Sequence, residues 1–256
     1  MQIEIFAILN KKENILDISL ITAMFPLLLK GLQYTILIAL IGIVFGFIIG
    51  CFAGFALQCK NKFLKAISYF YIWIIRGTPL IVQALYIYFV IPKTFNISLA
   101  IMSNGEVLVS ESVMAGIIAI TINSGAFIAE IVRSALESVD KGQWDAGKAL
   151  GLSYVQILFH IIVPIAMRNI MPALFNQFII SVKDTSILTI IVVPEITHQM
   201  QNYAITTFQT IPAYTFGALF YLSIISILMI IQKFIEKKLK LSSNGKIRGG
   251  NKVAKN

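Results

Sequence analysis

The sequence predicts an all-α integral membrane protein with five membrane-spanning helices. Of its 256 residues, 57% are hydrophobic and only 13% are charged, whereas a soluble domain has about 25% charged residues. The apolar residues gather in runs near the ~20 residues that a helix needs to cross a bilayer. This composition excludes a water-soluble enzyme and a disordered chain. The length leaves room for short loops, but not for a large extramembrane domain.

Five apolar segments are predicted to span the membrane as helices. They are residues 33–57, 69–91, 112–132, 159–182 and 213–234. The second contains Arg76, Gly77 and Pro79, and the glycine and the proline should kink it.

Two further apolar segments are expected not to span the membrane. Residues 187–193 are too few to cross it, so this run is expected to be re-entrant or interfacial. Residues 13–30 mix acids with apolar residues and contain Pro26. We expect them to form an interfacial helix within an N-terminal extension, residues 1–30.

A glycine stripe is predicted along the first span. Gly42, Gly46, Gly50 and Gly54 recur at every fourth residue, so they share one helix face where another backbone can approach closely. A gate or a dimer seam would use such a face. Ordinary helix packing within the subunit is the favoured interpretation.

The positive charge is concentrated in a C-terminal tail. The last 24 residues hold eight Lys or Arg and one acid. Phe234 is the only aromatic residue among these charges, so the tail is interpreted as a contact with anionic lipid and not with nucleic acid. Lys60, Lys62 and Lys65 follow the first span. By the positive-inside rule, residues 58–65 and the tail are cytoplasmic and the N-terminus lies outside.

Sites for metals, nucleotides and disulfides are not expected. Cys51 and Cys59 are eight residues apart, roughly 12 Å along a helix and beyond the ~7 Å limit for a disulfide, so both should be free thiols. His160 and His198 are far apart in sequence, and no glycine-rich phosphate loop is present. The chain is therefore expected to bind no metal and no cofactor.

The longest polar stretch between spans, residues 134–160, predicts a capped helix. Asp140 and Ser153 are each followed three residues later by Gln, a helix-start signature, and Gly151 suits a helix end. The loop should form a short helix over residues 141–150, a glycine turn, and a second helix that leads into the fourth span. Docking into a partner's groove and a plain linker helix on the membrane are equally compatible with this pattern.

The same loop resembles the conserved cytoplasmic loop of ABC importer permeases. The resemblance covers Trp144 to Gly151 and the following apolar stretch that ends at Pro164. Asp145 replaces the usual Glu with its charge kept, and Gly147 replaces an Ala, which should weaken the helix by up to ~1 kcal/mol. The resemblance implies the type I importer permease fold, with residues 134–160 as the coupling loop. It assigns ATPase docking to Trp144, Asp145, Ala146, Lys148 and Gly151.

Three more segments resemble permeases for polar amino acids, in the order and spacing of that family. They are residues 76–80 with Gln83, residues 123–131, and residues 183–186. The resemblance covers about residues 31–239, between the N-terminal extension and a basic tail of residues 240–256. It implies a bacterial inner-membrane importer with two permease subunits, identical or different. Separate ABC ATPase subunits and an outside solute-binding protein that delivers the amino acid are implied as partners.

Polar residues within the spans are the candidates for the substrate path and for structural or gating roles. Lys183 and Asp184 diverge by ~100° on a helix and so need other partners or a cavity. A zwitterionic amino acid needs a donor and an acceptor, but a structural ion pair with another helix is the alternative. The predicted substrate path comprises Gln83, Asn123, Ser124, Lys183, Asp184, Thr185 and Ser186.

The structural or gating group is Arg76, Gly77, Pro79, Glu130 and Arg133. Glu130 and Arg133 are three residues apart and should pair on one helix face. Arg76 either pairs with Glu130 or faces the cavity. His198 is expected in a loop near the outer surface.

Two other classes of protein compete with the importer interpretation. An ion-coupled secondary amino-acid transporter needs intramembrane carboxylates, which Glu130 and Asp184 offer, but five spans do not divide into two matched halves. A non-transporting membrane anchor predicts no polar residues at mid-membrane, and this sequence has several.

Overall fold

The helices of the protein lie in a tilted bundle, with short elements projecting at both ends. The computed structural model describes the backbone of residues 18–103 and 105–253 and the side chains of residues 19–103 and 105–238. The elements are α2 (Ile18–Gln58), α3 (Lys62–Arg76), α4 (Leu80–Leu85), the π-helical η1 (Tyr86–Val90), α5 (Ile91–Phe95), β1 (Ile101–Ser103), β2 (Glu106–Val109), α6 (Glu111–Glu137), α7 (Lys141–Ala149), α8 (Tyr154–Ile157), the π-helical η2 (Leu158–Ile162), α9 (Val163–Asp184), the 3₁₀-helical η3 (Thr185–Ile191), α10 (Ile196–Thr207) and α11 (Thr210–Val253). The strands form an antiparallel hairpin.

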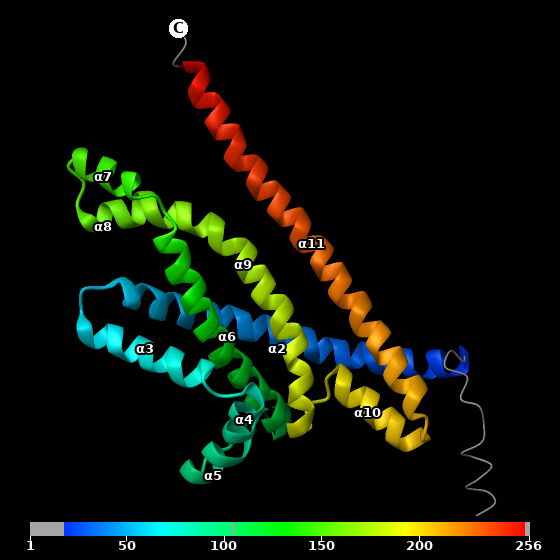
Figure 1. Ribbon diagram of the computed structural model, residues 1–256. Coiled ribbons are helices and arrows are strands. Elements are labelled where there is room, and N and C mark those ends of the chain that lie inside the picture. The colour runs from blue at the N-terminus through cyan, green and yellow to red at the C-terminus, as the bar shows by residue number, and fades with distance from the viewer. Residues whose placement is uncertain (1–17, 104, 254–256) are drawn as a thin grey trace, which may run out of the picture.

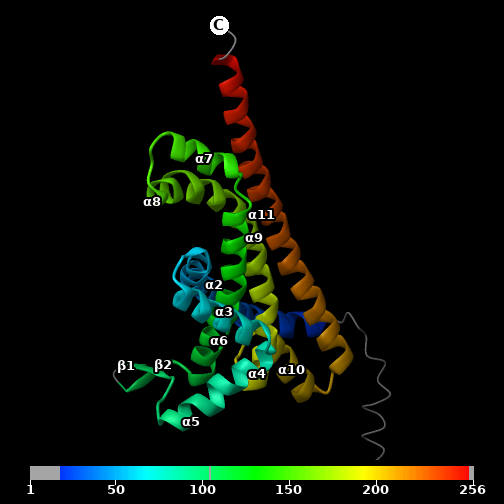
Figure 2. The ribbon, with the colours of Figure 1, turned by 60° about the vertical axis from the view of Figure 1, so that its left-hand side comes forward.

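Figures 1 and 2 show how the two ends differ. The short helices α7 and α8 and the C-terminal end of α11 lie at one end of the molecule. At the other end lie α5, α10 and the β1–β2 hairpin. The predicted coupling loop and the predicted basic tail therefore belong to the same end.

Four stretches of helix are long and apolar enough to cross a membrane: Ser19–Gln58, Glu111–Glu137, Tyr154–Ile191 and Thr210–Lys238. A fifth is the pair Lys62–Arg76 and Leu80–Phe95, which is bent by 101°. The prediction of five spans is confirmed when the bent pair counts as one span. The kink expected from Gly77 and Pro79 is a sharp turn.

Helix α2 differs from the prediction at its N-terminal end. Residues 18–30, expected in a separate interfacial helix, continue without a break into the first span, with Pro26 inside the helix. Proline is tolerated there because neighbouring groups re-satisfy the freed backbone in membrane helices. The rest of the predicted interfacial helix, residues 13–17, lies outside the described residues.

Helix α6 is the centre of the bundle. Within its most apolar window 67% of the residues are buried, against 11% for α11. Its residues belong to three of the four apolar clusters, through Ala119, Val132 and Ala129.

The glycine stripe packs on α6, as the favoured interpretation predicted. A Cβ at Gly42 would lie 2.5 Å from Ile120 Cγ2, and one at Gly54 would lie 2.8 Å from the Ala129 carbonyl oxygen. Only glycine allows this close approach, so the four glycines form an intrasubunit seam between α2 and α6.

The segment after α9 differs most from the prediction. The predicted run 187–193 begins within the 3₁₀-helix Thr185–Ile191, and Val192, the next residue, lies in the left-handed region (φ 60°). Leu188, Ile191 and Val193 are fully buried in the core. Helix α10 was not predicted, and His198 lies on it and not in a loop.

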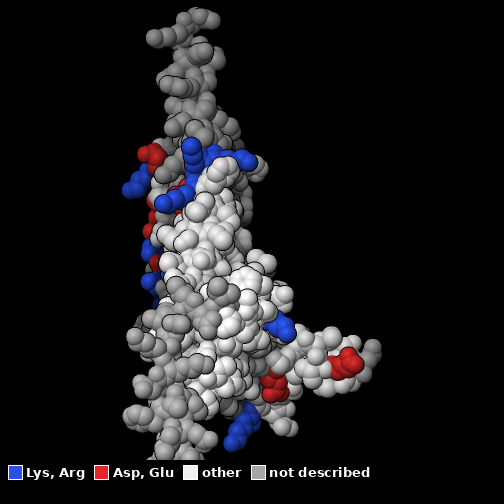
Figure 3. Space-filling view, turned by 90° about the vertical axis from the view of Figure 1, so that its right-hand side faces the viewer, with Lys and Arg blue, Asp and Glu red and all other residues white. Residues whose placement is uncertain are grey.

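The outer surface of the bundle is largely apolar. Large hydrophobic side chains are exposed along α2, α3 and α11, for example Phe52, Phe70 and Ile230. On the face shown in Figure 3, charged side chains gather above and below an uncharged band and along one edge. Such a band suits contact with lipid.

Candidate transport path and docking loop

The bend between α3 and α4 is held together by the side chain of Gln83. Its Nε2 donates to the Ile75 carbonyl oxygen at 2.7 Å and to two oxygens of Thr78 at 3.0 Å. Its Oε1 accepts a hydrogen bond from Asn123 Nδ2 on α6 at 3.2 Å. Gln83 therefore satisfies backbone groups that the break in the helix leaves unpaired.

Two predicted path residues, Asn123 and Ser124, are buried in the packed part of α6. Asn123 is 7% exposed and Ser124 is 1% exposed. The Ser124 hydroxyl donates to the carbonyl oxygens of Ile120 and Gly42, which lie on α6 and α2. Both side chains thus join helices within this subunit, a common role for polar groups in membrane helices.

We expect Gln83→Leu to destabilise the protein by about 2 kcal/mol. The change leaves the Ile75 carbonyl and the Asn123 amide without their partner, and each buried unpaired group costs about 1–3 kcal/mol. The measurement is the free energy of thermal unfolding in detergent. Gln33→Leu is the control, because Gln33 is exposed on α2. Equal stability of the two variants would show that Gln83 does not hold the bend.

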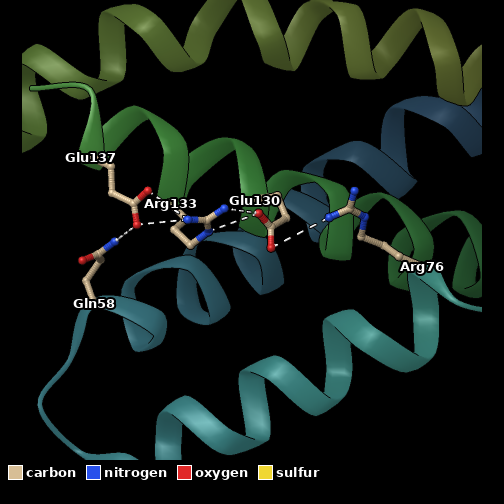
Figure 4. Close-up of polar contacts among 5 residues, drawn as sticks. All are labelled: Gln58, Arg76, Glu130, Arg133 and Glu137. Atoms are coloured by element: carbon tan, nitrogen blue, oxygen red, sulfur yellow. Dashed lines mark hydrogen bonds and ion pairs between the residues drawn. The ribbon is translucent and has the colours of Figure 1, made fainter.

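A chain of charged side chains runs along α6 (Figure 4). Glu130 Oε2 accepts hydrogen bonds from Arg133 Nη2 at 2.7 Å and Nε at 3.1 Å, which confirms the predicted pair. Arg133 Nη1 also contacts Glu137 at 2.9 Å, and Glu137 accepts a hydrogen bond from Gln58 at the end of α2. Arg76, at the end of α3, lies with Nη1 3.8 Å from Glu130 Oε1. These contacts tie the ends of α2 and α3 to α6.

Residues 183–186, the second half of the predicted path, form no hydrogen bond in the described part of the chain with Gln83 or Asn123. Lys183 is exposed, and neither Lys183 nor Asp184 forms an ion pair with another described residue. Thr185 is fully buried and donates to the Val182 carbonyl oxygen, while Ser186 donates to that of Lys183. The hydroxyl groups are therefore satisfied locally, where α9 tightens into η3.

The predicted capped helix is present in the loop between α6 and α9. Asp140 caps α7 by accepting from the Gly142 N–H at 2.6 Å, and Ser153 and Gln156 form a reciprocal capping box at α8. Gly151 between them has φ 76°, which favours glycine.

Aromatic stacking holds α7 against α8. The rings of Trp144 and Tyr154 stack with centroids 5.2 Å apart. A Cβ at Gly147 would lie 2.7 Å from Ile157 Cγ1, so glycine at this position permits the close packing. On the exposed face, Asp145 and Lys148 pair at 3.1 Å with side chains 72% and 67% exposed. The helix thus presents charge outward and packs through its aromatic face.

The end of α2 lies beside the same loop. A groove of about 940 Å³ is lined by Phe55, Gln58 and Lys60 from the α2 end and by Trp144 and Tyr154 from the loop. The lysine-rich turn and the loop therefore share one end of the molecule.

Glu195 is a prominent buried acid that sequence reasoning missed. It is fully buried and caps α10, accepting from the N–H groups of Thr197 (2.8 Å) and His198 (2.7 Å). The Tyr221 hydroxyl on α11 donates to Glu195 Oε2 at 3.0 Å. Burial raises the pKa of Glu195 to about 7, and these hydrogen bonds offset only part of that effect.

A helical bundle with an apolar outer band and a capped, charged helix held out at one end defines an integral membrane protein. The family model of the binding-protein-dependent transport system inner membrane component matches residues 42–241. The chain belongs to this family, whose members are transport permease subunits. Membership decides against the ion-coupled carrier and the membrane anchor.

Similar proteins cover most of the chain. The glutamine transport system permease protein GlnP of Escherichia coli (strain K12) is 39% identical over 88% of this chain and 98% of its own length. The probable amino-acid ABC transporter permease protein YckA of Bacillus subtilis (strain 168) is 35% identical over 88% of this chain and 95% of its own.

Solved structures share the fold. A chain of an amino acid ABC transporter crystallised with histidines matches with a TM-score of 0.78 and 29% identity, over 87% of this chain and 99% of its own. A chain of the inward-facing MetNI methionine ABC transporter matches with a TM-score of 0.70 at 17% identity, over 88% and 99%. The fold is therefore that of ABC importer permeases.

Proposed function

We propose that this chain is the transmembrane subunit of an ATP-driven importer and forms the translocation path for a polar amino acid. Family membership over residues 42–241 carries the proposal. Relatives named for glutamine and for L-cystine transport support the amino-acid class. The transport unit is residues 31–239, flanked by the N-terminal extension and the basic tail. Two permease subunits, identical or different, enclose one path.

Separate ABC ATPase subunits dock on α7. The helix is short, exposed and fixed to the bundle by the Trp144–Tyr154 stack, so it transmits a push from a partner as a rigid body. Asp145 and Lys148 form its charged outer face. ATP hydrolysis takes place on these partners, and the permease chain itself catalyses nothing.

The end of the molecule that carries α7 faces the cytoplasm, together with the C-terminus and the turn with Lys60, Lys62 and Lys65. The opposite end, with α5 and the β1–β2 hairpin, faces outside together with the N-terminus. A solute-binding protein delivers the amino acid at that outer end of a bacterial inner membrane. Closure of the ATPase dimer moves α7, and the spans rock around the path by alternating access.

The test is ATP-dependent uptake of labelled glutamine into proteoliposomes that hold the permease, its co-purifying ATPase and the binding protein. Asp145→Arg should lower uptake about tenfold, since reversing a charge in a docking contact typically costs on the order of 1–2 kcal/mol. Asp145→Glu keeps the charge and should keep uptake. Uptake that survives both Asp145→Arg and removal of the ATPase would overturn the importer proposal.

A further inference from the structure

The groove beside the docking loop, with a volume of about 940 Å³, lies where three membrane spans end together. Gln58 and Glu137 are the last residues of two spans, and Tyr154 is the first residue of a third. All three line the groove, and Gln58 donates a hydrogen bond to Glu137 at 2.9 Å (Figure 4). Because spans end near the lipid headgroups, the groove opens at the boundary between the bilayer and water.

Part of the groove lining is apolar and exposed. The rings of Phe55 on α2 and Phe159 on η2 stack with centroids 6.5 Å apart, and both line the groove. Phe159 is 57% exposed, and Val155, which also lines the groove, is 60% exposed. Apolar surface of this kind is more stable against hydrocarbon than against water. This part of the lining therefore suits an acyl chain.

An aromatic pair lines the groove from the loop. The stacked rings of Trp144 and Tyr154 belong to the lining. Trp and Tyr are enriched at membrane–water interfaces, because their rings combine an apolar body with a polar tip. The pair thus agrees with the headgroup level that the ends of the spans indicate.

Two of the three lysines in the lining have no acidic partner. Lys148 pairs with Asp145 at 3.1 Å, and the other lining acid, Glu137, is already paired on α6. Lys60 and Lys141 are exposed and form no ion pair within the described part of the chain. The groove therefore offers two ammonium groups to an incoming anion, and both of its carboxylates are already neutralised.

A phospholipid with an anionic headgroup matches the apolar and the cationic lining together. Basic pockets beside membrane helices are suited to such headgroups. A free phosphate ion would use the lysines alone and would leave the apolar lining in water. Asp145 and Lys148, part of the proposed ATPase contact, line the groove with side chains 72% and 67% exposed. A docked ATPase would therefore lie beside the lipid.

We propose that this groove binds one anionic phospholipid. An acyl chain lies against Phe55 and Phe159, and the headgroup phosphate pairs with Lys60 and Lys141. The bound lipid bridges the end of α2 to the docking helix α7. The inference goes beyond the transport function, because it holds whatever solute the protein carries.

The test uses Trp144 as a reporter inside the groove. The chain has two tryptophans, so Trp73→Phe in the full-length permease leaves Trp144 alone. The protein is placed in phosphatidylcholine vesicles that contain increasing fractions of a lipid with brominated acyl chains, which quench tryptophan fluorescence on contact. Brominated phosphatidylglycerol should reach half-quenching at a mole fraction at least about fivefold lower than brominated phosphatidylcholine, the preference expected from one lysine at a membrane surface.

Lys60→Gln and Lys141→Gln should each reduce this lipid preference about fivefold, since each removes one ammonium group. Lys141→Arg keeps the charge and should keep the preference, which separates lost charge from a disturbed fold. Lys62→Gln is the matched control, because Lys62 is exposed at the same end of the molecule and does not line the groove.

The second tryptophan controls for general contact with lipid. Trp73 is 71% exposed on α3 and does not line the groove. In Trp144→Phe, the two brominated lipids should therefore quench the remaining Trp73 at equal mole fractions.

Four results would overturn the inference. The first is equal quenching of Trp144 by the two lipids, and the second is an unchanged preference in both Lys60→Gln and Lys141→Gln. The third is loss of the preference in an excess of inorganic phosphate, which would make the groove a site for a free anion. The fourth uses a photoactivatable phosphatidylglycerol that crosslinks to residues 154–162. Loss of these crosslinks when the ATPase subunits bind would mean that the ATPase fills the groove.

Discussion

Replacing Gly50 by leucine is expected to abolish folding of the bundle. A Cβ at this position would already lie 2.6 Å from Ile128 Cγ2 and 2.9 Å from the Gly125 carbonyl oxygen. Ile128 is fully buried, so its side chain has nowhere to move. The added side chain would force α2 away from α6, the most buried span, and we expect a loss of about 5 kcal/mol or more, comparable with the stability of a whole domain.

Size-exclusion chromatography of the fluorescently tagged variant in detergent measures the monodisperse fraction. Gly50→Ala should give an intermediate result, because it adds the Cβ alone. Val44→Leu is the control on the same helix, since Val44 is 50% exposed. A monodisperse Gly50→Leu protein that melts within about 2 °C of the wild type would contradict the intrasubunit seam.

Loss of the proton from Glu195 is expected to make the end of the bundle around α10 less stable as pH rises. The residue lies between the span that ends at Ile191 and the one that begins at Thr210. Its pKa is about 7 in the folded protein, raised by burial, against 4.5 for an ordinary glutamate. The folded state therefore holds the proton more tightly. The resulting stability is fully present below pH 4.5 and is lost as pH rises through about 7, a change of about 3 kcal/mol.

Thermal unfolding midpoints of the wild type and Glu195→Gln between pH 5 and 8 test this expectation. The advantage of the wild type over the variant should shrink as pH rises, because glutamine does not titrate. Glu106→Gln serves as the control, because Glu106 is exposed on β2. If the melting midpoints of the wild type and Glu195→Gln changed in parallel with pH, Glu195 would have the same pKa in the folded and the unfolded protein, and the expectation would be wrong.

The sequence predicted the elements whose signals are local. Periodic glycines revealed the stripe on α2, and the cap residues Asp140 and Ser153 revealed α7 and α8. The partner of the stripe was not predictable, because nothing in the spacing of glycines identifies the facing helix. Helix α10 was missed because it is polar and begins at Glu195, which is not among the preferred N-cap residues.

The candidate site was predicted less completely. Residues 183–186 have an unusual local pattern, but their hydroxyl groups are satisfied by nearby carbonyls. Arg76 and Glu130 come from different helices, so their approach depends on how α3 packs against α6.

The glycine seam has a mechanical consequence for transport. Helices that interlock backbone to backbone cannot slide or separate without losing their whole contact, so α2 and α6 must travel together. Helix α7 follows α6 in the chain. A displacement of α7 therefore moves α6 together with all 41 residues of α2 as one rigid unit. The deformable joints then lie elsewhere, at the α3–α4 bend and at the α9–η3 junction.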